Sequence, residues 1–475
     1  MRLIPYFASR SVTALFCLFA ALPDGQAADW PRFRGPNGSG VSEARQLPVK
    51  FNAKENLVWK ADVPGGTSSP IVVGSRLYYT GFDKDERLVV AVDAKTGKEV
   101  WRKSLTKERT ESAHPLNGPA TPTPASDGKN LYVFFPEIGM VSFDGEGDQR
   151  WKTPIGPFHS VQGLAGSPVA AGGLVFLPID QTRDSFLAAF DAKTGKQRWK
   201  VDRPSNPLGS YTTPVYHKPK SGPAQIIMMG AIEIAGYQAD TGERLWWIRG
   251  MTTAPAASPV LIGDILYASE TAGTDLATPF KMFLPMDKNK DGKLERSEIP
   301  NAGMQRLLLG VDEDAGNKDG FVEESEWLKF EENNKNGGGM MAIDINGRGD
   351  LSKSGIKWRV TKSIPYLTAT VLYNDVIYTV RDGGILSSYN PASGEVHKQG
   401  RLEGALDKYY AQPVAGDGKI YLTSENGKVS VVKAGKEWEL LSVNDLEEPT
   451  YATPALADGR VFVRTRKALY CFGTP

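Results

Sequence analysis

Two stretches of this sequence are near-copies of each other: LVVAVDAKTGKEVW (residues 88–101) and FLAAFDAKTGKQRW (residues 186–199). Each joins an apolar run to a polar run that ends in tryptophan, and the turn DAKTGK lies between them. In such a turn the aspartate side chain caps backbone N–H groups, and the glycine accepts a positive φ. Each stretch therefore predicts two antiparallel β-strands joined by a tight turn.

Weaker copies of this phrase recur along the chain and end at Trp151, Trp246, Trp358, His397 and Trp438. Counted from Trp59, successive ends are 42, 50, 48, 47, 112, 39 and 41 residues apart. A period of roughly 40 to 50 residues is typical of β-propeller blades, and removing about 65 residues from the long step would restore it. The long step therefore predicts an insertion in the fifth blade.

A second repeated signal is a Ser/Thr–Pro or similar step that leads into an alternating apolar run, a Gly/Asp turn and another such run. This pattern predicts a β-hairpin, so that each unit comprises four antiparallel strands with the tryptophan on the outermost strand. Eight such starts occur, near Ser69, Thr121, Ser167, Thr213, Ser258, Ala369, Gln412 and Thr453.

The first and last units are each incomplete. The segment around Trp59 has a tryptophan strand without a preceding unit, and the last unit, which ends at ALYCFGTP, lacks such a strand. Pairing the two would close a ring and remove exposed sheet edges. We therefore predict an all-β fold, an eight-bladed β-propeller over residues 28–475, with a small α-helical insertion.

These units resemble the repeats of pyrroloquinoline-quinone (PQQ) enzymes, and DWPRFRGPNGSGVS from Asp29 resembles the N-terminal stretch of exported PQQ-like propellers. The chain is identified on these motifs as an exported PQQ-like, quinoprotein-type propeller, over nearly all of its length outside the insertion. The resemblance is specific for the fold. It implies no single activity, because the family includes PQQ-dependent dehydrogenases, outer-membrane assembly scaffolds and propellers of unassigned role.

Residues 1–27 have the pattern of a secretory signal peptide. Arg2 and Arg10 give a positive N-terminal region, a short apolar run follows over residues 12–22, and small residues precede a cleavage point near Ala27 and Ala28. That run is shorter than the roughly 20 residues that span a bilayer. We expect a periplasmic or secreted protein with no transmembrane segment after cleavage.

Charge and cysteine content narrow the classes of partner. Removing residues 1–27 leaves equal numbers of basic and acidic residues, which argues against nucleic acid or an anionic membrane as a partner. Cys471 would then be the sole cysteine, so the fold would hold without an intrachain disulfide.

Residues 271–339 break the β pattern and contain DKNKDGKLERSE, residues 287–298. This matches a twelve-residue EF-hand loop, with Gly292 at the sharp turn and Leu294 at the position that pairs with a partner loop. Hard oxygen ligands at this spacing favour Ca²⁺ over Mg²⁺. The predicted ligands, with Lys293 contributing its backbone carbonyl, are Asp287, Asn289, Asp291, Lys293 and Glu298.

A second, irregular loop follows, and its candidate ligands are Asp314, Asn317, Asp319 and Glu326. Position 1 falls on Ala315, which offers no side-chain oxygen, and Asp314 is one residue too early. Two readings stay open: a variant loop that binds metal, or a pseudo-site that only pairs with the first loop. Pro285 and Pro300 should shorten the helices beside loop one, which favours a calcium-stabilised knob over an opening sensor.

Side chains just before the inner strands should gather around the central channel, where they could bind a planar ligand or a peptide, or simply line the blade junctions. They are His114, Asn117, His159, Gln162, Tyr211, Tyr366, Tyr409, Tyr410 and Tyr451. Arg464 could hold an anion there or bridge two blades, the second being favoured. His217 is expected in an exposed turn.

Two functions remain open on the sequence. The first is a binding or scaffold propeller that holds an unidentified envelope protein or small ligand on one face, with structural Ca²⁺ in the insertion. The alternative is a periplasmic PQQ-dependent dehydrogenase, for which the resemblance implies adjacent cysteines, a tryptophan platform, a calcium ion and an aspartate base. The chain has no adjacent cysteines, so PQQ is not favoured, and no catalytic or cofactor-binding residue is assigned.

Overall fold

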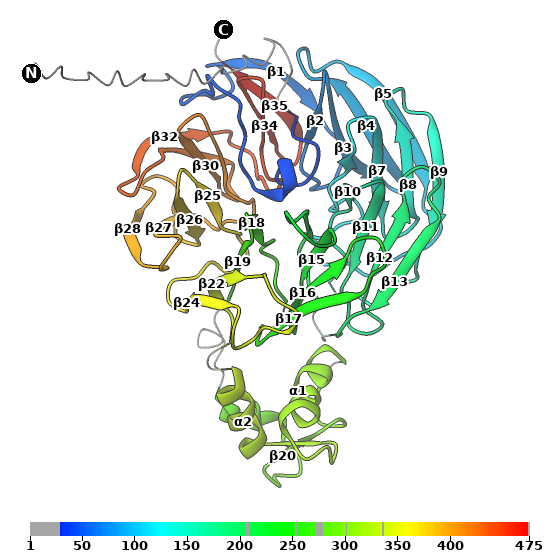
Figure 1. Cartoon of the computed structure of the whole chain (residues 1–475), viewed down its shortest axis with the longest axis vertical. Coiled ribbons are helices and arrows are strands. Elements are labelled where there is room, and N and C mark those ends of the chain that lie inside the picture. Colours follow the sequence, from blue (N-terminus) through cyan, green and yellow to red (C-terminus); the bar gives the residue numbers. More distant parts are fainter. Residues whose placement is uncertain are drawn as a thin grey trace, which may run out of the picture.

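The computed structural model describes residues 29–160, 162–205, 209–251, 254–271, 279–300, 302–334 and 337–473. The predicted signal peptide lies outside this part of the chain. Eight sheets of at least four strands follow one another around a ring (Figure 1), which confirms the predicted eight-bladed β-propeller. The four main strands of each blade are antiparallel, and they are given below in order from the channel outward.

Blades 1 to 4 use consecutive strands. Blade 4 also carries a fifth, parallel edge strand, β23 (Gly349–Asp350), which pairs with β17. The bounds are, for blade 1, β2 (Ile71–Val73), β3 (Arg76–Asp83), β4 (Glu86–Asp93) and β5 (Glu99–Thr106); for blade 2, β6 (Ala125–Ser126), β7 (Asn130–Phe135), β8 (Gly139–Asp144) and β9 (Gln149–Pro154); for blade 3, β10 (Val169–Ala171), β11 (Leu174–Ile179), β12 (Phe186–Asp191) and β13 (Gln197–Asp202); and for blade 4, β14 (Val215–His217), β15 (Gln225–Met229), β16 (Glu233–Gln238) and β17 (Arg244–Arg249).

Blades 5 to 8 complete the ring. Their bounds are, for blade 5, β18 (Val260–Ile262), β19 (Ile265–Glu270), β22 (Gly339–Asp344) and β24 (Ile356–Val360); for blade 6, β25 (Val371–Tyr373), β26 (Val376–Arg381), β27 (Ile385–Tyr389) and β28 (Val396–Arg401); for blade 7, β29 (Val414–Gly416), β30 (Lys419–Thr423), β31 (Lys428–Lys433) and β32 (Glu439–Asp445); and for blade 8, β33 (Ala455–Ala457), β34 (Arg460–Arg464), β35 (Ala468–Gly473) and β1 (Leu57–Asp62).

Blade 8 joins the two ends of the described chain. Strand β1 pairs antiparallel with β35, and Trp59 lies opposite Cys471. The predicted closure is therefore confirmed, and the buried thiol of Cys471 is free.

The repeated tryptophan and the repeated glycine fit each other across blade boundaries. The Trp59 indole donates to the Ala94 carbonyl of blade 1 at 3.0 Å. A Cβ on Gly97, whose φ is +71°, would lie 2.5 Å from the Trp59 ring. Trp151 meets Gly195 in the same way, also at 2.5 Å. The glycine of DAKTGK thus serves both the turn and the close approach of the preceding blade's tryptophan.

The Ser/Thr–Pro steps form hydrogen bonds from blade to blade around the channel. At each step a backbone N–H donates to a side-chain oxygen of the next blade: Ser69 to Thr123 (2.9 Å), Thr123 to Ser167 (3.0 Å), Ser167 to Thr213 (3.1 Å), Thr213 to Ser258 (2.9 Å), Ala369 to Gln412, Gln412 to Thr453 (3.0 Å) and Thr453 to Ser69 (3.0 Å). The series breaks between Ser258 and Ala369, because alanine carries no acceptor.

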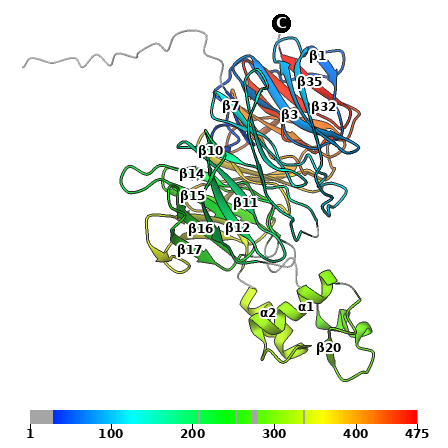
Figure 2. The same cartoon turned by 90° about the vertical axis from the view of Figure 1, so that its right-hand side faces the viewer.

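The insertion lies between β19 and β22 of blade 5 and stands away from the wheel (Figures 1 and 2). It has its own small core, in which Leu294, Val322 and Trp327 are buried. Its elements are the 3₁₀ turns η3 (Phe280–Met282) and η4 (Leu284–Met286), strands β20 (Lys293–Glu295) and β21 (Phe321–Glu323), and helices α1 (Ala302–Ala315) and α2 (Glu324–Asn334). No helix in the described part of the chain is long and apolar enough to cross a membrane.

Candidate functional site

The wheel has two different faces. The first, which we call the open face, is formed by the connections between blades and by the turns between the second and third strands of each blade. The insertion emerges from this face. The opposite, sealed face is covered by residues 29–51, which include the 3₁₀ turn η1 (Pro36–Gly38) and cross the middle of the wheel in blue in Figure 1. This segment bonds to blade 1 through Trp30 and Val72, and to blade 7 through Ser42 and Ala415.

On the open face, the structure brings four of the predicted channel residues together. The Gln162 carbonyl accepts from the His114 N–H at 3.1 Å and from the Asn117 side chain at 3.0 Å. The Tyr211 hydroxyl donates to Oε1 of Gln162 at 3.3 Å. Burial and the nearby Tyr366 hydroxyl raise the pKa of Tyr211, so it stays a neutral donor at physiological pH.

Aromatic rings continue this rim on the other side of the channel. The rings of Tyr410 and Tyr451 lie 5.4 Å apart, and the Arg466 guanidinium stands 4.9 Å from the Tyr451 ring. Tyr366 is 62% exposed. Tyr409 departs from the predicted group, because it is buried and its hydroxyl donates to the Ala405 carbonyl at 2.7 Å.

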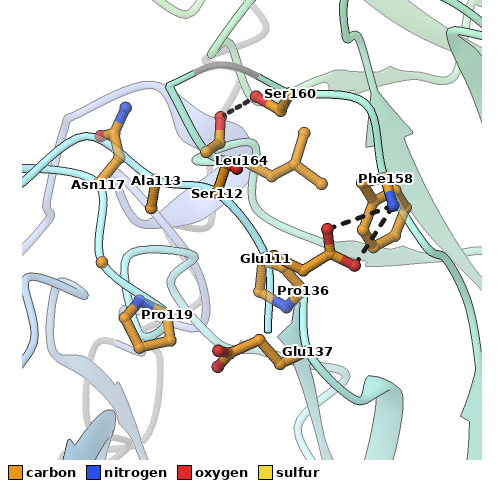
Figure 3. A pocket seen from close by; sticks show the side chains of 12 residues that line it. Glu111, Ser112, Ala113, Asn117, Pro119, Pro136, Glu137, Phe158, Ser160 and Leu164 are labelled. Atoms are coloured by element: carbon orange, nitrogen blue, oxygen red, sulfur yellow. Dashed lines mark hydrogen bonds between the residues drawn. The ribbon is translucent and has the colours of Figure 1, made fainter. Parts of the chain in front are cut away.

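A small cavity lies beneath the rim between blades 1, 2 and 3 (Figure 3). Glu111, Pro136, Phe158 and Leu164 are among its lining residues, and Glu111 accepts from the Phe158 N–H at 3.3 Å. Its volume of about 30 Å³ suits one water molecule. A planar cofactor or a peptide side chain would therefore have to bind above it.

Buried arginines hold the blades together below the rim. Arg87 pairs with Glu137 across blades 1 and 2. Arg203 forms a two-pronged pair with Asp180 of its own blade 3, at 2.8 and 3.1 Å, and donates to the Tyr237 hydroxyl of blade 4 at 2.8 Å. Arg464 donates to the Ser68 and Thr80 carbonyls of blade 1, at 3.0 and 2.7 Å, which confirms the blade-to-blade reading.

His159 and His217 lie in different settings. His159 is near Arg183, whose Nη2 lies 3.3 Å from its Nδ1, and its backbone N–H donates to Gln181 at 2.7 Å. The prediction for His217 is wrong. Instead of lying in an exposed turn, His217 is the last residue of strand β14 and is buried. Its Nε2 lies 3.1 Å from Oδ1 of Asp264 in blade 5.

The first acidic loop of the insertion wraps its carboxylates inward. Asp287 accepts from the N–H groups of Lys290 and Gly292, at 2.7 and 2.9 Å. Glu298 is buried and accepts from the N–H groups of Lys288 and Glu295, at 2.8 and 3.2 Å. Gly292 has a φ of +82°, as the sharp turn at this position requires.

The same loop holds its other two predicted side chains close together. The Asn289 amide donates to Oδ2 of Asp291 at 3.1 Å, and Oδ1 of Asp291 accepts from the Lys293 N–H at 2.9 Å. In the described part of the chain, no three His, Cys, Asp or Glu side chains already converge as a metal cluster. The oxygens instead accept from the loop's own N–H groups.

The second loop repeats this arrangement with a different first residue. Asp312 accepts from the N–H groups of Lys318 and Gly320, at 2.6 and 2.8 Å, as Asp287 does in loop one. Glu326 accepts from the Asn317 and Glu323 N–H groups, at 2.9 and 3.2 Å. The Asn317 amide donates to Asp319 at 3.0 Å. The side chain of Asp314 lies outside the described part, so its predicted role stays a prediction.

Asp312 reaches this position because helix α1 carries it there. Asp312 lies in the last turn of α1, and the Gly316 N–H caps that turn by donating to the Asp312 carbonyl at 3.0 Å. A Cβ on Gly316 would lie 2.4 Å from Oε1 of Glu326. Glycine at this position therefore lets the helix end meet the glutamate.

The two loops are coupled through a short antiparallel sheet. Leu294 of β20 lies opposite Val322 of β21, and both side chains are fully buried. This is the contact that the apolar residue at position 8 predicts. The two loops therefore share one small sheet and one core.

Comparison with known proteins places these features in a family. The family model described as "Outer membrane protein assembly factor BamB" matches residues 42–177 and 121–280, which together make half of the chain. The outer membrane protein assembly factor BamB of Burkholderia pseudomallei is 30% identical over 179 residues, 36% of this chain and 41% of that protein. A polyvinylalcohol dehydrogenase of Pseudomonas sp is 29% identical over 187 residues, 34% of this chain and 28% of that enzyme.

Solved structures agree on the fold. BamB from Moraxella catarrhalis aligns with a TM-score of 0.53 at 10% identity, over 88% of this chain and 99% of that chain. Quinohemoprotein alcohol dehydrogenase from Comamonas testosteroni aligns with a TM-score of 0.56 at 11% identity, over 94% of this chain and 81% of that chain.

The chain spans less than half the length of the curated relatives it matches, so their activities do not transfer with the fold. On the repeat, the ring of eight blades and the family match, this chain belongs to the PQQ-type β-propeller family of the outer membrane protein assembly factor BamB.

Proposed function

We propose that this chain is an exported binding propeller, which holds an envelope protein or a small ligand on its open face and calcium in its insertion. The aromatic rim carries the proposal. Tyr366 is 62% exposed and Leu406 is 50% exposed, both on connections between blades. Tyrosine offers a large contact area with a polar end, the chemistry typical of protein-binding surfaces.

The two faces support this choice of surface. The sealed face is occupied by residues 29–51, which bond to the inner strands of several blades. The open face presents Tyr366, Tyr410 and Tyr451 from three successive connections. One matched relative is named as an outer membrane protein assembly factor. A peptide or exposed strand of an envelope protein is the occupant that an aromatic rim would suit.

The insertion would bind calcium in both loops. In loop one the ligands would be Asp287, Asn289, Asp291, the Lys293 carbonyl and Glu298. The shared hydrogen-bond pattern supports Asp312 as the first ligand of loop two, with the side chains of Asn317, Asp319 and Glu326 following in register. Extracellular EF-hand modules bind Ca²⁺ with Kd values on the order of 10⁻⁴ to 10⁻³ M, which would fit a stabilising ion.

Calcium chemistry is supported by the donor set. Buried Glu298 accepts from three backbone N–H groups, and buried Glu326 accepts from two. This holds both carboxylates in their loops before an ion arrives, and hard oxygen donors on two paired loops suit Ca²⁺. The ion would replace weak internal contacts, such as the 3.1 Å bond from Asn289 to Asp291.

The second candidate is a PQQ-dependent oxidoreductase, favoured by the sequence match to the polyvinylalcohol dehydrogenase. The donors of the open face do not fit a quinone–calcium centre well. The buried carboxylates Glu137 and Asp180 are already paired with Arg87 and Arg203. The repeated tryptophans, such as Trp151 and Trp199, pack between blades instead of facing the channel.

One experiment separates the two candidates. The full chain is used to capture proteins from an envelope extract, in parallel with the Tyr366→Ala/Tyr410→Ala variant and a Val396→Ala control on the outer strand of blade 6. We expect one defined envelope protein to be retained by the wild type and the control and lost by the rim variant. Dye-coupled alcohol oxidation that depends on added PQQ and Ca²⁺, with no retained protein, would instead establish the oxidoreductase.

A further inference from the structure

The buried arginines in the described part of the chain have, with one exception, several hydrogen-bond partners. Arg87 and Arg203 each pair with a buried carboxylate, Glu137 and Asp180. Arg464 donates to carbonyl oxygens of blade 1 and lies 5.0 Å from the ring centre of Tyr79. A buried guanidinium requires such partners, because removing its charge from water is costly.

Arg34 of the sealing segment follows the Arg464 pattern. It is fully buried, and it donates to the Thr370 carbonyl at 2.6 Å and the Ser258 carbonyl at 3.3 Å. These carbonyls belong to blades 5 and 6, at the point where the ring of side-chain hydrogen bonds is broken by Ala369. Arg34 therefore joins the two blades that the repeat leaves unconnected.

Arg32 is the exception. It is 5% exposed, and its one hydrogen bond to a described residue runs from Nη2 to Oδ1 of Asn37, at 3.1 Å. Its Nε is buried without a partner, as are the Nε atoms of Arg34 and Arg464, but those two arginines have several further hydrogen bonds. Asn37 is itself exposed and shares the same oxygen with the Tyr216 N–H at 3.2 Å.

Neither charge is offset by a carboxylate in the described part of the chain. Burial lowers the pKa of Arg32 to about 10 and that of Arg34 to about 9, and no acidic group opposes this lowering. Both side chains remain protonated at neutral pH. Two positive charges, two residues apart, therefore lie inside the propeller without a negative partner.

The two sides of the Arg32 guanidinium differ in how closely they are packed. A Cβ on Gly38 would lie 3.1 Å from Nη2 of Arg32 and 3.8 Å from Val215 of β14. The backbone of Gly38 therefore packs closely against the guanidinium, and this side leaves no room for a side chain. On the other side, Asn37 accepts from Nη2 and is exposed to solvent, so a small ligand would reach the guanidinium past Asn37.

We infer that the guanidinium of Arg32, beneath η1 at the channel, binds an oxyanion of the carboxylate or phosphate type. The planar fork of arginine offers two parallel N–H donors to such a group, and chloride would satisfy it less well. Arg34, held at the boundary of blades 5 and 6, adds a second positive charge. The site is independent of the rim and of the calcium loops.

The test compares anions and variants of the full chain in calcium-free buffer at constant ionic strength. The melting temperature is measured against inorganic phosphate, acetate and chloride, for wild type, Arg32→Gln and Arg45→Gln. Arg45 lies on the same segment and is exposed, so it controls for a change of net charge. Phosphate also stabilises proteins by exclusion from their surface, and the control variant measures that part.

We expect wild type and Arg45→Gln to show a saturable rise of a few degrees with millimolar phosphate or acetate. Arg32→Gln should lack this rise and should melt at a higher temperature than wild type when no oxyanion is present, because its buried charge is gone. Preference for phosphate over acetate, or the reverse, identifies the type of oxyanion.

Two results would overturn the inference. One is a saturable response that persists in Arg32→Gln. The other is a wild type without a saturable response and without calorimetrically detectable binding of phosphate or acetate. If Arg32→Gln does not fold, Arg32→Lys replaces it, because it keeps the charge but loses the fork and should bind at least tenfold more weakly.

Discussion

The sealed and open faces of this propeller are built from the same repeat and yet differ in what they bury. On the sealed face, Trp30 is fully buried and bonds to Val72 through its backbone. On the open face, Tyr366 is 62% exposed. The difference teaches that one face is committed to closing the ring, while the other leaves large aromatic side chains free for a partner.

The largest expected effect comes from Trp30→Ala on the sealed face. This change leaves a large hole among core residues of blades 1 and 8 and should cost about 3–5 kcal/mol of unfolding free energy. Urea denaturation followed by circular dichroism measures it. A loss below about 1 kcal/mol, within the range of ordinary surface substitutions, would show that residues 29–51 do not stabilise the wheel.

Arg203→Met tests the ion pairs that lie beneath the open face. The variant leaves Asp180, 5% exposed, as an unpaired buried carboxylate, and should cost about 3 kcal/mol. The double variant Arg203→Met/Asp180→Leu should recover much of that loss in the same denaturation assay. Equal losses in the single and double variants would contradict an ion pair as the main contact.

Glu298→Gln tests whether calcium acts through the insertion on the open side. An ion present at 100 times its Kd stabilises the bound form by about 2.7 kcal/mol. The variant should lose the calcium-dependent rise in melting temperature, whereas the exposed control Glu324→Gln should keep it. An unchanged calcium response in Glu298→Gln would exclude loop one as the site.

Asp312→Asn and Asp314→Asn form a matched pair for loop two. Titration calorimetry should give two calcium ions for wild type and for Asp314→Asn, but one for Asp312→Asn, because the hydrogen-bond pattern of loop one is repeated around Asp312. One ion in the Asp314→Asn variant and two in the Asp312→Asn variant would assign the ligand the other way.

The smallest expected effect on stability belongs to Tyr366→Ala. Because this side chain is exposed, its loss should change the unfolding free energy by less than about 0.5 kcal/mol. The difference in unfolding free energy between Tyr366→Ala and Trp30→Ala measures directly how much more the sealed face contributes to stability than the open face. A cost near that of Trp30→Ala would mean that the rim tyrosine is a packing residue.

The sequence was sufficient to predict the wheel because the decisive contacts repeat locally. The turn DAKTGK and its tryptophan mark each blade, and one blade's Trp59 meets the next blade's Gly97 at a fixed spacing. Closure by the Trp59 strand followed from two incomplete units. Nothing outside the repeat was needed to place these strands.

The parts that were not foreseen depend on contacts between segments far apart in the chain. Arg34 bonds to Thr370, 336 residues away, and no local pattern marks that pair. Asp312 was missed because counting residues assumes a loop of standard length, whereas a helix end at Gly316 carries Asp312 into place. The nearest sequence signal was Gly316 directly after an acidic helical run. His217 was misplaced because its partner, Asp264, lies in the next blade.

Site-specific photo-cross-linking in the envelope tests the division between the faces most directly. A photoreactive residue is placed at position 366 on the open face, or at position 95, an exposed lysine in a turn of the sealed face. We predict one discrete protein adduct from position 366 and none from position 95. An adduct from position 95 alone, or identical adducts from both positions, would contradict a binding surface on the open face.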